Sequence, residues 1–296
     1  MIKKIDAPFI IDLKGTELTA EDKALLAHPQ VGGVIFFTRN FESTAQLKAL
    51  TQTIRKINPK LLLTVDQEGG RIQRFKTGLT PIPSMGELGK AYLQDSKAAL
   101  VSATTLGFTL ASELKVLGID MTFAPVLDLD RGLSAVVGDR AFSQDPDIVI
   151  ALGKALMAGF RQAGMPAVGK HFPGHGSVAI DSHVGLPVDH RYLDAILQSD
   201  IKPFKALIDF GIEALMPAHI IFSKIDALPA CFSKRWLSDI LRGQLGFSGL
   251  IFSDCMSMNG AKSVGDLKTR TQLAQEAGCD YVLICNDRHG VLSLLS

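Results

Sequence analysis

Short apolar segments rich in branched and aromatic residues alternate along this chain with longer segments in which apolar residues recur every three to four positions. The first pattern is typical of buried strands, and the second is typical of amphipathic helices. Eight strands are predicted, at about 8–12, 31–37, 61–66, 121–126, 167–171, 214–219, 250–254 and 281–285. Helices are predicted at 44–57, 96–117, 147–163, 192–210, 234–245 and 266–277.

Strands that alternate with helices in this way predict an α/β protein built as a single (β/α)8 barrel of the TIM type, in preference to an open doubly wound sheet. No linker rich in Pro, Gly or Ser divides the chain, and 296 residues is an ordinary length for one such barrel. Residues 1–296 are therefore expected to form one catalytic domain. Only residues 286–296 follow the last strand, so the final helix is expected to be short or truncated.

Polar side chains collect where the predicted strands end. They are Asp66, Asp128, Lys170 with His171, His219 and Asp254. Loops are polar in general, so any one of these positions is ordinary by itself. Polar side chains at five strand ends are less easily explained in that way. Barrel enzymes keep their chemistry at this end of the strands, and the pattern therefore predicts an active site there.

The charge balance argues against polyanionic partners. Thirty-one Lys and Arg against thirty Asp and Glu leave a net charge of +1, so neither nucleic acid nor an anionic membrane is expected to bind. The four cysteines, Cys231, Cys255, Cys279 and Cys285, lack the spacing of a zinc ribbon or a disulfide framework, and reduced thiols are expected. No apolar run is long enough for a signal peptide or a membrane span. We expect a cytoplasmic, monomeric protein that acts on a small molecule.

The segment 170–176 reads KHFPGHG, and Asp181-Ser182-His183 follows it. Pro173 and the glycines exclude a regular helix, so a loop leaving the fifth strand is predicted, and the helical geometry of a two-histidine metal site is lost. Asp181 and His183 flank a single residue, so the carboxylate can orient the imidazole as a proton shuttle. The alternative is a loop histidine that pairs with a local carboxylate and has no catalytic role.

The segment 249–258 reads GLIFSDCMSM, an apolar strand that delivers Asp254 at its end. A carboxylate in that place can reach the barrel axis and attack an anomeric carbon. The alternative is an N-cap for the following helix, which is common for an aspartate at a strand-to-helix turn.

Two further segments carry groups that suit sugar hydroxyls. Residues 66–74 read DQEGGRIQR, in which adjacent glycines permit a tight turn while Asp66 and Arg74 offer an acceptor and donors. Residues 138–142 read GDRAF and place Arg140 in a loop after the fourth strand.

Together these segments resemble glycoside hydrolase family 3, and within it the bacterial single-domain β-N-acetylhexosaminidases of peptidoglycan recycling. The resemblance covers nearly the whole chain and is most specific over 170–183. It implies that Asp254, in the family's Ser-Asp motif, forms the covalent glycosyl-enzyme. It also implies that His183 is the general acid and then the general base, oriented by Asp181. The implied substrate-binding residues are Asp66, Arg74, Arg140, Lys170 and His171, and no metal or other cofactor is implied.

Two features depart from the family pattern. The residue after the nucleophile is often a second aspartate but is Cys255 here, and Met256 stands where leucine is common. The C-terminal part also looks shorter than is usual for the family. The aspartate of the motif is intact, so the departures concern the surroundings of the nucleophile and the last helix.

The implied reaction retains anomeric configuration and releases terminal non-reducing N-acetylglucosamine from muropeptides. His183 protonates the departing oxygen while Asp254 attacks, and neutral His183 then takes a proton from the water that releases the sugar. A neutral imidazole would not repel an anionic acceptor, so phosphorolysis is an alternative. Two others are a metal-dependent barrel hydrolase with His171, His175 and His219 as ligands, and an inactive sugar-binding protein.

Overall fold

All eight predicted strands occur in the computed structural model, which describes residues 6–182 and 185–296. They are β1 (Phe9–Asp12), β2 (Val31–Phe36), β3 (Leu62–Val65), β6 (Met121–Thr122), β7 (Val168–Phe172), β9 (Ala214–Pro217), β11 (Leu250–Ile251) and β12 (Val282–Ile284). β6 and β11 are shorter than the apolar runs that predicted them. Pro125 accounts for the early end of β6, because proline has no N–H to donate to a neighbouring strand.

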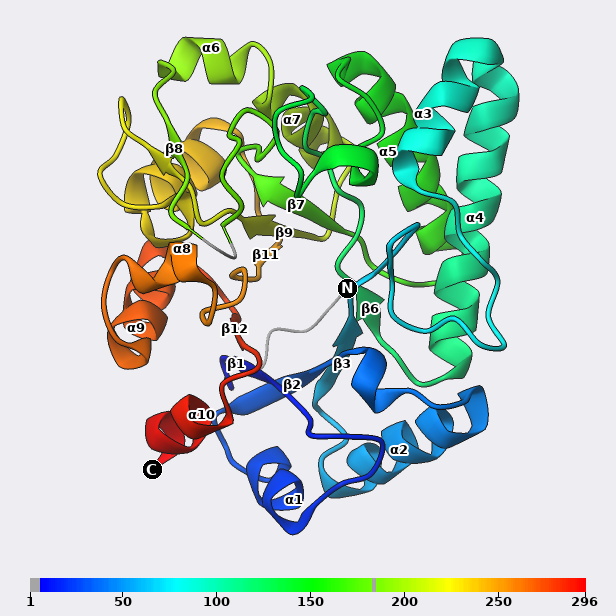
Figure 1. Ribbon diagram of the computed structural model, residues 1–296, viewed down its shortest axis with the longest axis vertical. Helices are drawn as coiled ribbons and strands as arrows, with labels where there is room; N and C mark the ends of the chain where they lie inside the picture. The colour runs from blue at the N-terminus through cyan, green and yellow to red at the C-terminus, as the bar shows by residue number, and fades with distance from the viewer. Residues whose placement is uncertain (1–5, 183–184) are drawn as a thin grey trace.

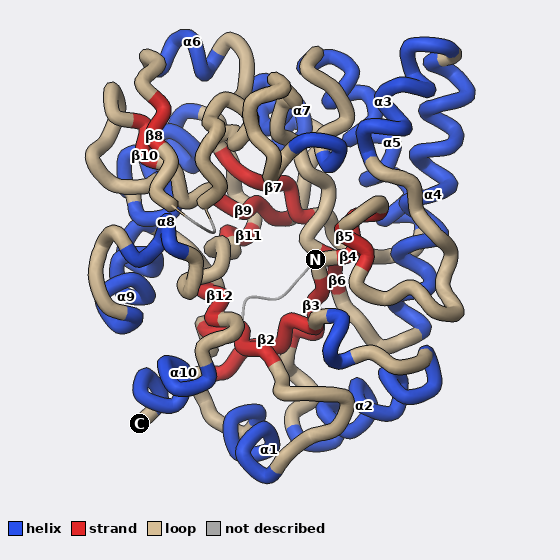
Figure 2. The backbone as a smooth tube through the Cα atoms, viewed as in Figure 1, coloured by secondary structure: helices blue, strands red, loops and turns tan. Residues whose placement is uncertain are grey.

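The eight strands surround a central space, and helices lie outside them (Figure 1). Five form one parallel sheet in the order β12-β1-β2-β3-β6, and three form another in the order β11-β9-β7. Single parallel bridges connect the two sheets at both junctions, Val126 with Lys170 and Phe252 with Tyr281. The predicted α/β fold with parallel strands in chain order is therefore confirmed, and Figure 2 shows strands of the two sheets around the centre with helices outside them.

The strand side chains separate into two hydrophobic clusters, because successive residues of a strand point to opposite faces. In β1, Ile10 belongs to the inner cluster while Phe9 and Ile11 belong to the outer cluster under the helices. The inner cluster also contains Ile35, Met121, Phe123, Val168, Ala214, Met216, Phe252, Tyr281, Leu283 and Cys285. These side chains fill the space inside the strands, so a ligand site has room above them, at the strand ends.

Many helices begin at a polar residue whose side chain accepts a backbone N–H of the first turn, which is favourable at that position. Thr19, Ser43 and Asp95 do so for α1 (Ala20–Leu26), α2 (Thr44–Ile57) and α4 (Ser96–Val116). The other α-helices include α3 (Met85–Gln94), α5 (Pro146–Gln162), α8 (Asn259–Lys262), α9 (Leu267–Ala277) and α10 (Arg288–Leu295). Short 3-10 helices are η1 (Thr38–Asn40), η2 (Gly138–Arg140) and η3 (Ala230–Phe232), and η4 (Arg235–Gln244) is a π-helix.

The single helix predicted over 192–210 is wrong. The segment forms two helices, α6 (Leu193–Leu197) and α7 (Ile201–Asp209). Pro203 lies in the first turn of α7, where its missing N–H costs little, but its ring would clash with the carbonyl group four residues earlier if one helix continued through. The other five predicted helices agree with the structure to within one residue at each end, and the short last helix is α10.

Glycines let α4 and α5 pack side by side at very short range (Figure 1). A Cβ atom on Gly159 of α5 would lie 2.1 Å from the carbonyl oxygen of Thr104, and one on Gly107 of α4 would lie 2.3 Å from that of Leu156. Since neither contact is possible for a real side chain, both positions require glycine. α5 leads directly into β7, so this contact supports a strand that contributes to the site described below.

Two further pairs of short strands lie outside the two parallel sheets. The antiparallel hairpin of β4 (Gln67–Gly69) and β5 (Ile72–Gln73) follows β3, and Gly70 at its turn has a φ of 54°. This is the tight turn predicted from the paired glycines. β8 (Val188–Asp189) pairs in parallel with β10 (Ile221–Phe222). Over 6–182 and 185–296, no helix is both long enough and apolar enough to pass through a membrane.

Candidate active site

A cavity of about 310 Å³ lies at the carboxyl ends of the strands. Inner-cluster side chains form its floor, and they include Ile35, Phe123, Met216 and Leu283. Polar side chains that line it include Asp66, Glu68, Arg74, Arg140, Lys170, His171, Asp181, Asp254, Cys255 and Ser257. Small-molecule sites usually enclose about 300–1,000 Å³, so this cavity suits a ligand of about one sugar ring.

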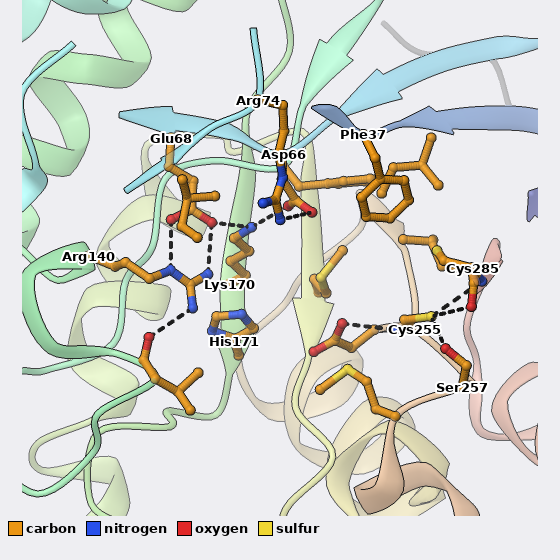
Figure 3. A pocket seen from close by; sticks show the side chains of 18 of the residues that line it. Phe37, Asp66, Glu68, Arg74, Arg140, Lys170, His171, Cys255, Ser257 and Cys285 are labelled. Carbon is orange, nitrogen blue, oxygen red and sulfur yellow. Dashed lines mark hydrogen bonds and ion pairs between the residues drawn. The ribbon is translucent and has the colours of Figure 1, made fainter. Parts of the chain in front are cut away.

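One side of the cavity is a network of ion pairs, which we call the ion-paired wall: Asp66, Glu68, Arg140 and Lys170 (Figure 3). Nζ of Lys170 lies 2.8 Å from Oδ1 of Asp66 and 2.6 Å from Oε1 of Glu68. Arg140 donates from Nε and Nη2 to the two carboxylate oxygens of Glu68, each at 2.8 Å. The side chains of Lys170 and Glu68 are each only 3% exposed, so the paired groups of this cavity wall are largely shielded from solvent.

The pairing keeps the ion-paired wall charged in spite of its burial. Burial alone would raise the pKa of Glu68, but Lys170 and Arg140 outweigh it and hold the pKa of that carboxyl well below its usual range. Burial would also lower the pKa of Lys170, but Asp66 and Glu68 outweigh it and raise the pKa of the ammonium group. At neutral pH the wall therefore presents fixed charges to a bound ligand, and hydrogen bonds to charged groups are the stronger ones.

Arg74 and Phe37 line the cavity beside Asp66. Nη2 of Arg74 lies 4.0 Å from Oδ2 of Asp66, whose side chain is 22% exposed. Nε of Arg74 is buried and has no hydrogen-bond partner among the residues that the structure describes. The Arg74 guanidinium also lies 5.8 Å from the centre of the Phe37 ring, so an aromatic side chain supports a donor at the cavity edge.

A buried carboxylate holds His171 in the cavity wall. Oδ2 of Asp128 lies 2.7 Å from Nδ1 of His171, while Oδ1 accepts the backbone N–H groups of His171 and His175. Because Nδ1 faces Asp128, Nε2 is the ring nitrogen of His171 that can meet a ligand. His175 lies behind it, with Nε2 3.1 Å from Oγ of Ser182. Burial and the nearby His171 lower the pKa of His175, which favours a neutral ring.

The segment after β11 forms another side of the cavity, which we call the Asp254 wall: Asp254, Cys255, Ser257 and Met258. Asp254 is half-buried, and its Oδ1 accepts the backbone N–H of Cys255 at 2.7 Å. It does not cap the next helix, because Met258 occupies the N-cap position of α8. In Figure 3 Cys255 and Ser257 lie to the right and the ion-paired wall to the left. Asp254 is the one carboxylate in its wall.

Asp181 is half-buried and lines the same cavity, whereas His183 lies outside the described residues. Ser182, which precedes His183, is buried, and its carbonyl oxygen accepts the N–H of Gly260 in α8 at 2.9 Å. The structure therefore places Asp181, the carboxylate of the predicted Asp-His pair, in the same cavity as Asp254.

The sequence from residue 5 to residue 296 matches the model of the family described as "Glycosyl hydrolase family 3 N terminal domain". The chain belongs to glycosyl hydrolase family 3. The resemblance inferred from the motifs is thus confirmed, and so is the prediction of a glycoside hydrolase.

Named relatives and solved structures are similar to this chain over most of its length. A "Beta-hexosaminidase" of Methylobacillus flagellatus is 54% identical over 280 residues, which are 94% of this chain and 80% of that protein. The crystal structure of NagZ from Neisseria gonorrhoeae in complex with N-trifluoroacetyl-D-glucosamine has a TM-score of 0.93 at 44% identity, covering 98% of this chain and 84% of the other. A family 3 β-N-acetylglucosaminidase from Paenibacillus sp. has a TM-score of 0.91 at 32% identity, covering 97% and 55%.

The structure brings the predicted site residues of this family 3 chain together over the residues that it describes, which do not include His183. Asp66, Arg74, Arg140, Lys170, His171, Asp181 and Asp254 all line the one cavity, and their chemical roles stay predictions. Glu68, at the centre of the ion-paired wall, was missed. A usable signal was its spacing, because residues two apart in an extended segment point the same way, and Glu68 follows Asp66 by two.

Each of the three histidines of the metal-dependent alternative has one ring nitrogen engaged in another contact. His171 is held by Asp128, and His175 lies against Ser182. Nε2 of His219 lies 3.1 Å from the carbonyl oxygen of Cys255, and its ring stacks on Phe232. Within the described parts of the chain, no group of three His, Cys, Asp or Glu side chains is arranged to hold a metal ion.

Proposed function

We propose that this chain is a retaining β-N-acetylhexosaminidase that releases terminal non-reducing N-acetylglucosamine from peptidoglycan-derived muropeptides. The observation that carries the proposal is the position of Asp254. Its carboxylate is half-buried at the end of β11 and shares a sugar-sized cavity with a fixed set of charged hydrogen-bonding groups. The names of the similar proteins, beta-hexosaminidase and β-N-acetylglucosaminidase, support the same activity.

The framework for this chemistry is the proposed (β/α)8 barrel. The two sheets and the two single bridges would act as one closed ring of eight strands. Side chains at the ends of different strands then converge on one point, as catalysis in such barrels requires. We further propose that the whole chain is one catalytic domain, that it is monomeric, and that it works in the cytoplasm.

In the first chemical step Asp254 attacks the anomeric carbon as the bond to the departing oxygen breaks. Its Oδ1 accepts the Cys255 N–H, and this contact orients the carboxylate relative to the strand end. His183 donates a proton to the departing oxygen, so the aglycone leaves as a neutral alcohol. Asp181 orients the imidazole from the cavity wall. The products of this step are the free aglycone and a covalent sugar ester on Asp254.

In the second step neutral His183 accepts a proton from water, and the water oxygen displaces Asp254 from the sugar. Two displacements at one carbon restore the original configuration. The ion-paired wall, Arg74 and His171 would hold the hydroxyls and the 2-acetamido group throughout. Because Glu68 and Lys170 already have partners, these groups need little reorganisation as positive charge develops on the sugar ring.

The decisive experiment combines labelling with product analysis. A 2-fluoro or 5-fluoro glycoside slows release of the covalent intermediate, and mass spectrometry of peptides should locate the added sugar on Asp254. Defined muropeptides and chitobiose should yield free N-acetylglucosamine with β configuration when first formed. An adduct elsewhere, or initial α product, would contradict the proposal, and glycosyl phosphate formed in phosphate buffer would indicate phosphorolysis instead.

A further inference from the structure

Two thiols lie in the cavity, next to the proposed nucleophile. Cys255 is half-buried and Cys285, which follows β12, is 2% exposed, and both line the cavity. The backbone N–H of Cys285 donates to Sγ of Cys255 at 3.3 Å, and Sγ of Cys255 lies 3.8 Å from the carbonyl oxygen of Cys285. Figure 3 shows these contacts on the right of the cavity. A thiol placed here meets whatever small molecule enters the sugar site.

The surroundings of Cys255 also favour its thiolate. A hydrogen bond from the Cys285 thiol and contacts from Ser257 lower the pKa of Cys255. Oγ of Ser257 lies 3.1 Å from its sulfur. The interaction of Cys285 with Cys255 and its burial raise the pKa of Cys285, which favours its protonated thiol. The thiolate is the reactive form of cysteine, so the pair consists of one attacking sulfur and one neighbouring thiol.

We propose that Cys255 and Cys285 are a redox-active thiol pair, at which peroxides form a disulfide that reversibly stops catalysis. The Cys255 thiolate attacks one peroxide oxygen, the O–O bond breaks, and hydroxide leaves to yield a sulfenic acid. The Cys285 sulfur then attacks that of Cys255, loses its proton and displaces the oxygen as water. The sum is two thiols and one hydrogen peroxide giving one disulfide and two waters.

A disulfide at this place would act on Asp254 through the main chain. The N–H of Cys255 holds Oδ1 of Asp254 at 2.7 Å, so drawing the Cys255 sulfur toward Cys285 shifts the group that orients the carboxylate. This consequence rests on the proposed function of Asp254, whereas the thiol chemistry does not. A reducing dithiol would reverse the bond by exchange.

The chain contains a matched control pair. Sγ of Cys279 lies 3.8 Å from the carbonyl oxygen of Cys231, the same distance as in the cavity pair. Cys231 and Cys279 are 0% and 6% exposed and do not line the cavity, and burial raises the pKa of Cys231 well above its usual value. The two pairs therefore share contact distance but differ in access and in thiolate character, and only the cavity pair is expected to react.

The test treats the full chain with hydrogen peroxide and compares it with Cys255→Ser, Cys285→Ser and Cys279→Ser. Peptide mapping of the original chain after peroxide treatment should show a cross-link between the peptides of residues 255 and 285, with a loss of about 2 Da. Activity, normalised to the same protein before treatment, should fall more than about tenfold and return with dithiothreitol. Cys279→Ser should behave identically, and Cys285→Ser should stop at a sulfenic acid that dimedone traps.

Bound N-acetylglucosamine should slow the oxidation, because it occupies the same cavity. Absence of the 255–285 cross-link, or a 231–279 cross-link instead, would overturn the thiol pair, whatever the substrate of the enzyme. A complete cross-link without loss of activity would overturn its control over Asp254. Equal inactivation of Cys255→Ser and the original chain would also overturn the control of the disulfide over Asp254. Failure of the proposed function is seen separately, as absence of hexosaminidase activity before any treatment.

Discussion

Different interactions hold the side chains on the two sides of the cavity. In the ion-paired wall, four charged side chains from three parts of the chain satisfy one another at 2.6 to 2.8 Å. In the Asp254 wall, one carboxylate stands among thiol, hydroxyl and thioether groups and is oriented by the N–H of its neighbour. Strong ion pairs can thus fix the binding groups in position before a ligand arrives. The nucleophile must remain reactive, so a backbone N–H orients it in place of an ion pair.

The largest predicted effect on activity comes from a substitution in the Asp254 wall. Asp254→Ala removes the nucleophile, so kcat should fall by about 10⁴- to 10⁶-fold, the scale seen when a covalent catalyst is deleted. The substrate affinity should change little, because the ion-paired wall is untouched. Steady-state kinetics and binding calorimetry with N-acetylglucosamine measure the two quantities. Asp209→Ala, on an exposed part of α7, is the control, and substantial turnover by Asp254→Ala would refute the assignment.

Deleting the proposed acid should have the next largest effect, and an effect that depends on the leaving group. His183→Ala should slow natural substrates by about 10²- to 10⁴-fold, the range for general acid catalysis. Activated aryl glycosides, whose leaving groups need no proton, should be much less affected in the glycosylation step. Asp181→Asn should show the same dependence more weakly. Equal losses for both classes of substrate would show that this loop does not supply the proton.

Breaking the ion-paired wall should appear chiefly as lost stability. Glu68→Ala leaves Lys170 and Arg140 buried with less compensation, so the free energy of unfolding should fall by about 3–5 kcal/mol. Denaturant titration measures it. The exposed pair Arg235–Asp239 is the control, and Asp239→Ala should cost less than about 1 kcal/mol. Similar losses for the two variants would mean that the wall is not a rigid element.

The same wall should give the protein a characteristic acid sensitivity. The folded-state pKa of Glu68 is lowered by Lys170 and Arg140, which outweigh its burial. A lowered pKa contributes stability that is fully present above the unfolded-state value, about 4.3, and is lost as the pH falls below it. Unfolding titrations should therefore show stability from this source constant above about pH 5 and decreasing below about pH 4. Glu68→Gln should remove that part of the acid dependence.

The smallest predicted effect concerns the edge between the two walls. Phe37→Ala removes the ring 5.8 Å from the Arg74 guanidinium. A contact of this kind contributes about 0.5–1 kcal/mol, which corresponds to a rise in KM of about two- to fivefold. Phe108→Ala, at a 45% exposed position on α4, is the matched control. A loss confined to kcat would indicate that Phe37 acts in the chemical step instead.

The sequence predicted much of this site because its chemistry lies at strand ends. Asp66, Lys170 and Asp254 each follow or end an apolar run, and in a parallel fold such positions converge. The pairing of Glu68 with Lys170 and Arg140 was not predictable in this way, since these partners lie 102 and 72 positions from Glu68 in the sequence and meet it only in the folded chain. Pro203 indicates that 192–210 divides into two helices, but the periodicity of apolar residues continues across the break and by itself predicts one helix.

The close approach of α4 and α5 makes the enzyme sensitive at a place remote from its chemistry. One added methyl group at residue 159 would meet a main-chain oxygen at 2.1 Å, and α5 would have to move outward. Six residues after the end of that helix comes β7, whose own last residues hold the ammonium and imidazole groups of the cavity. The alignment of those groups thus depends partly on two positions that have no side chain at all.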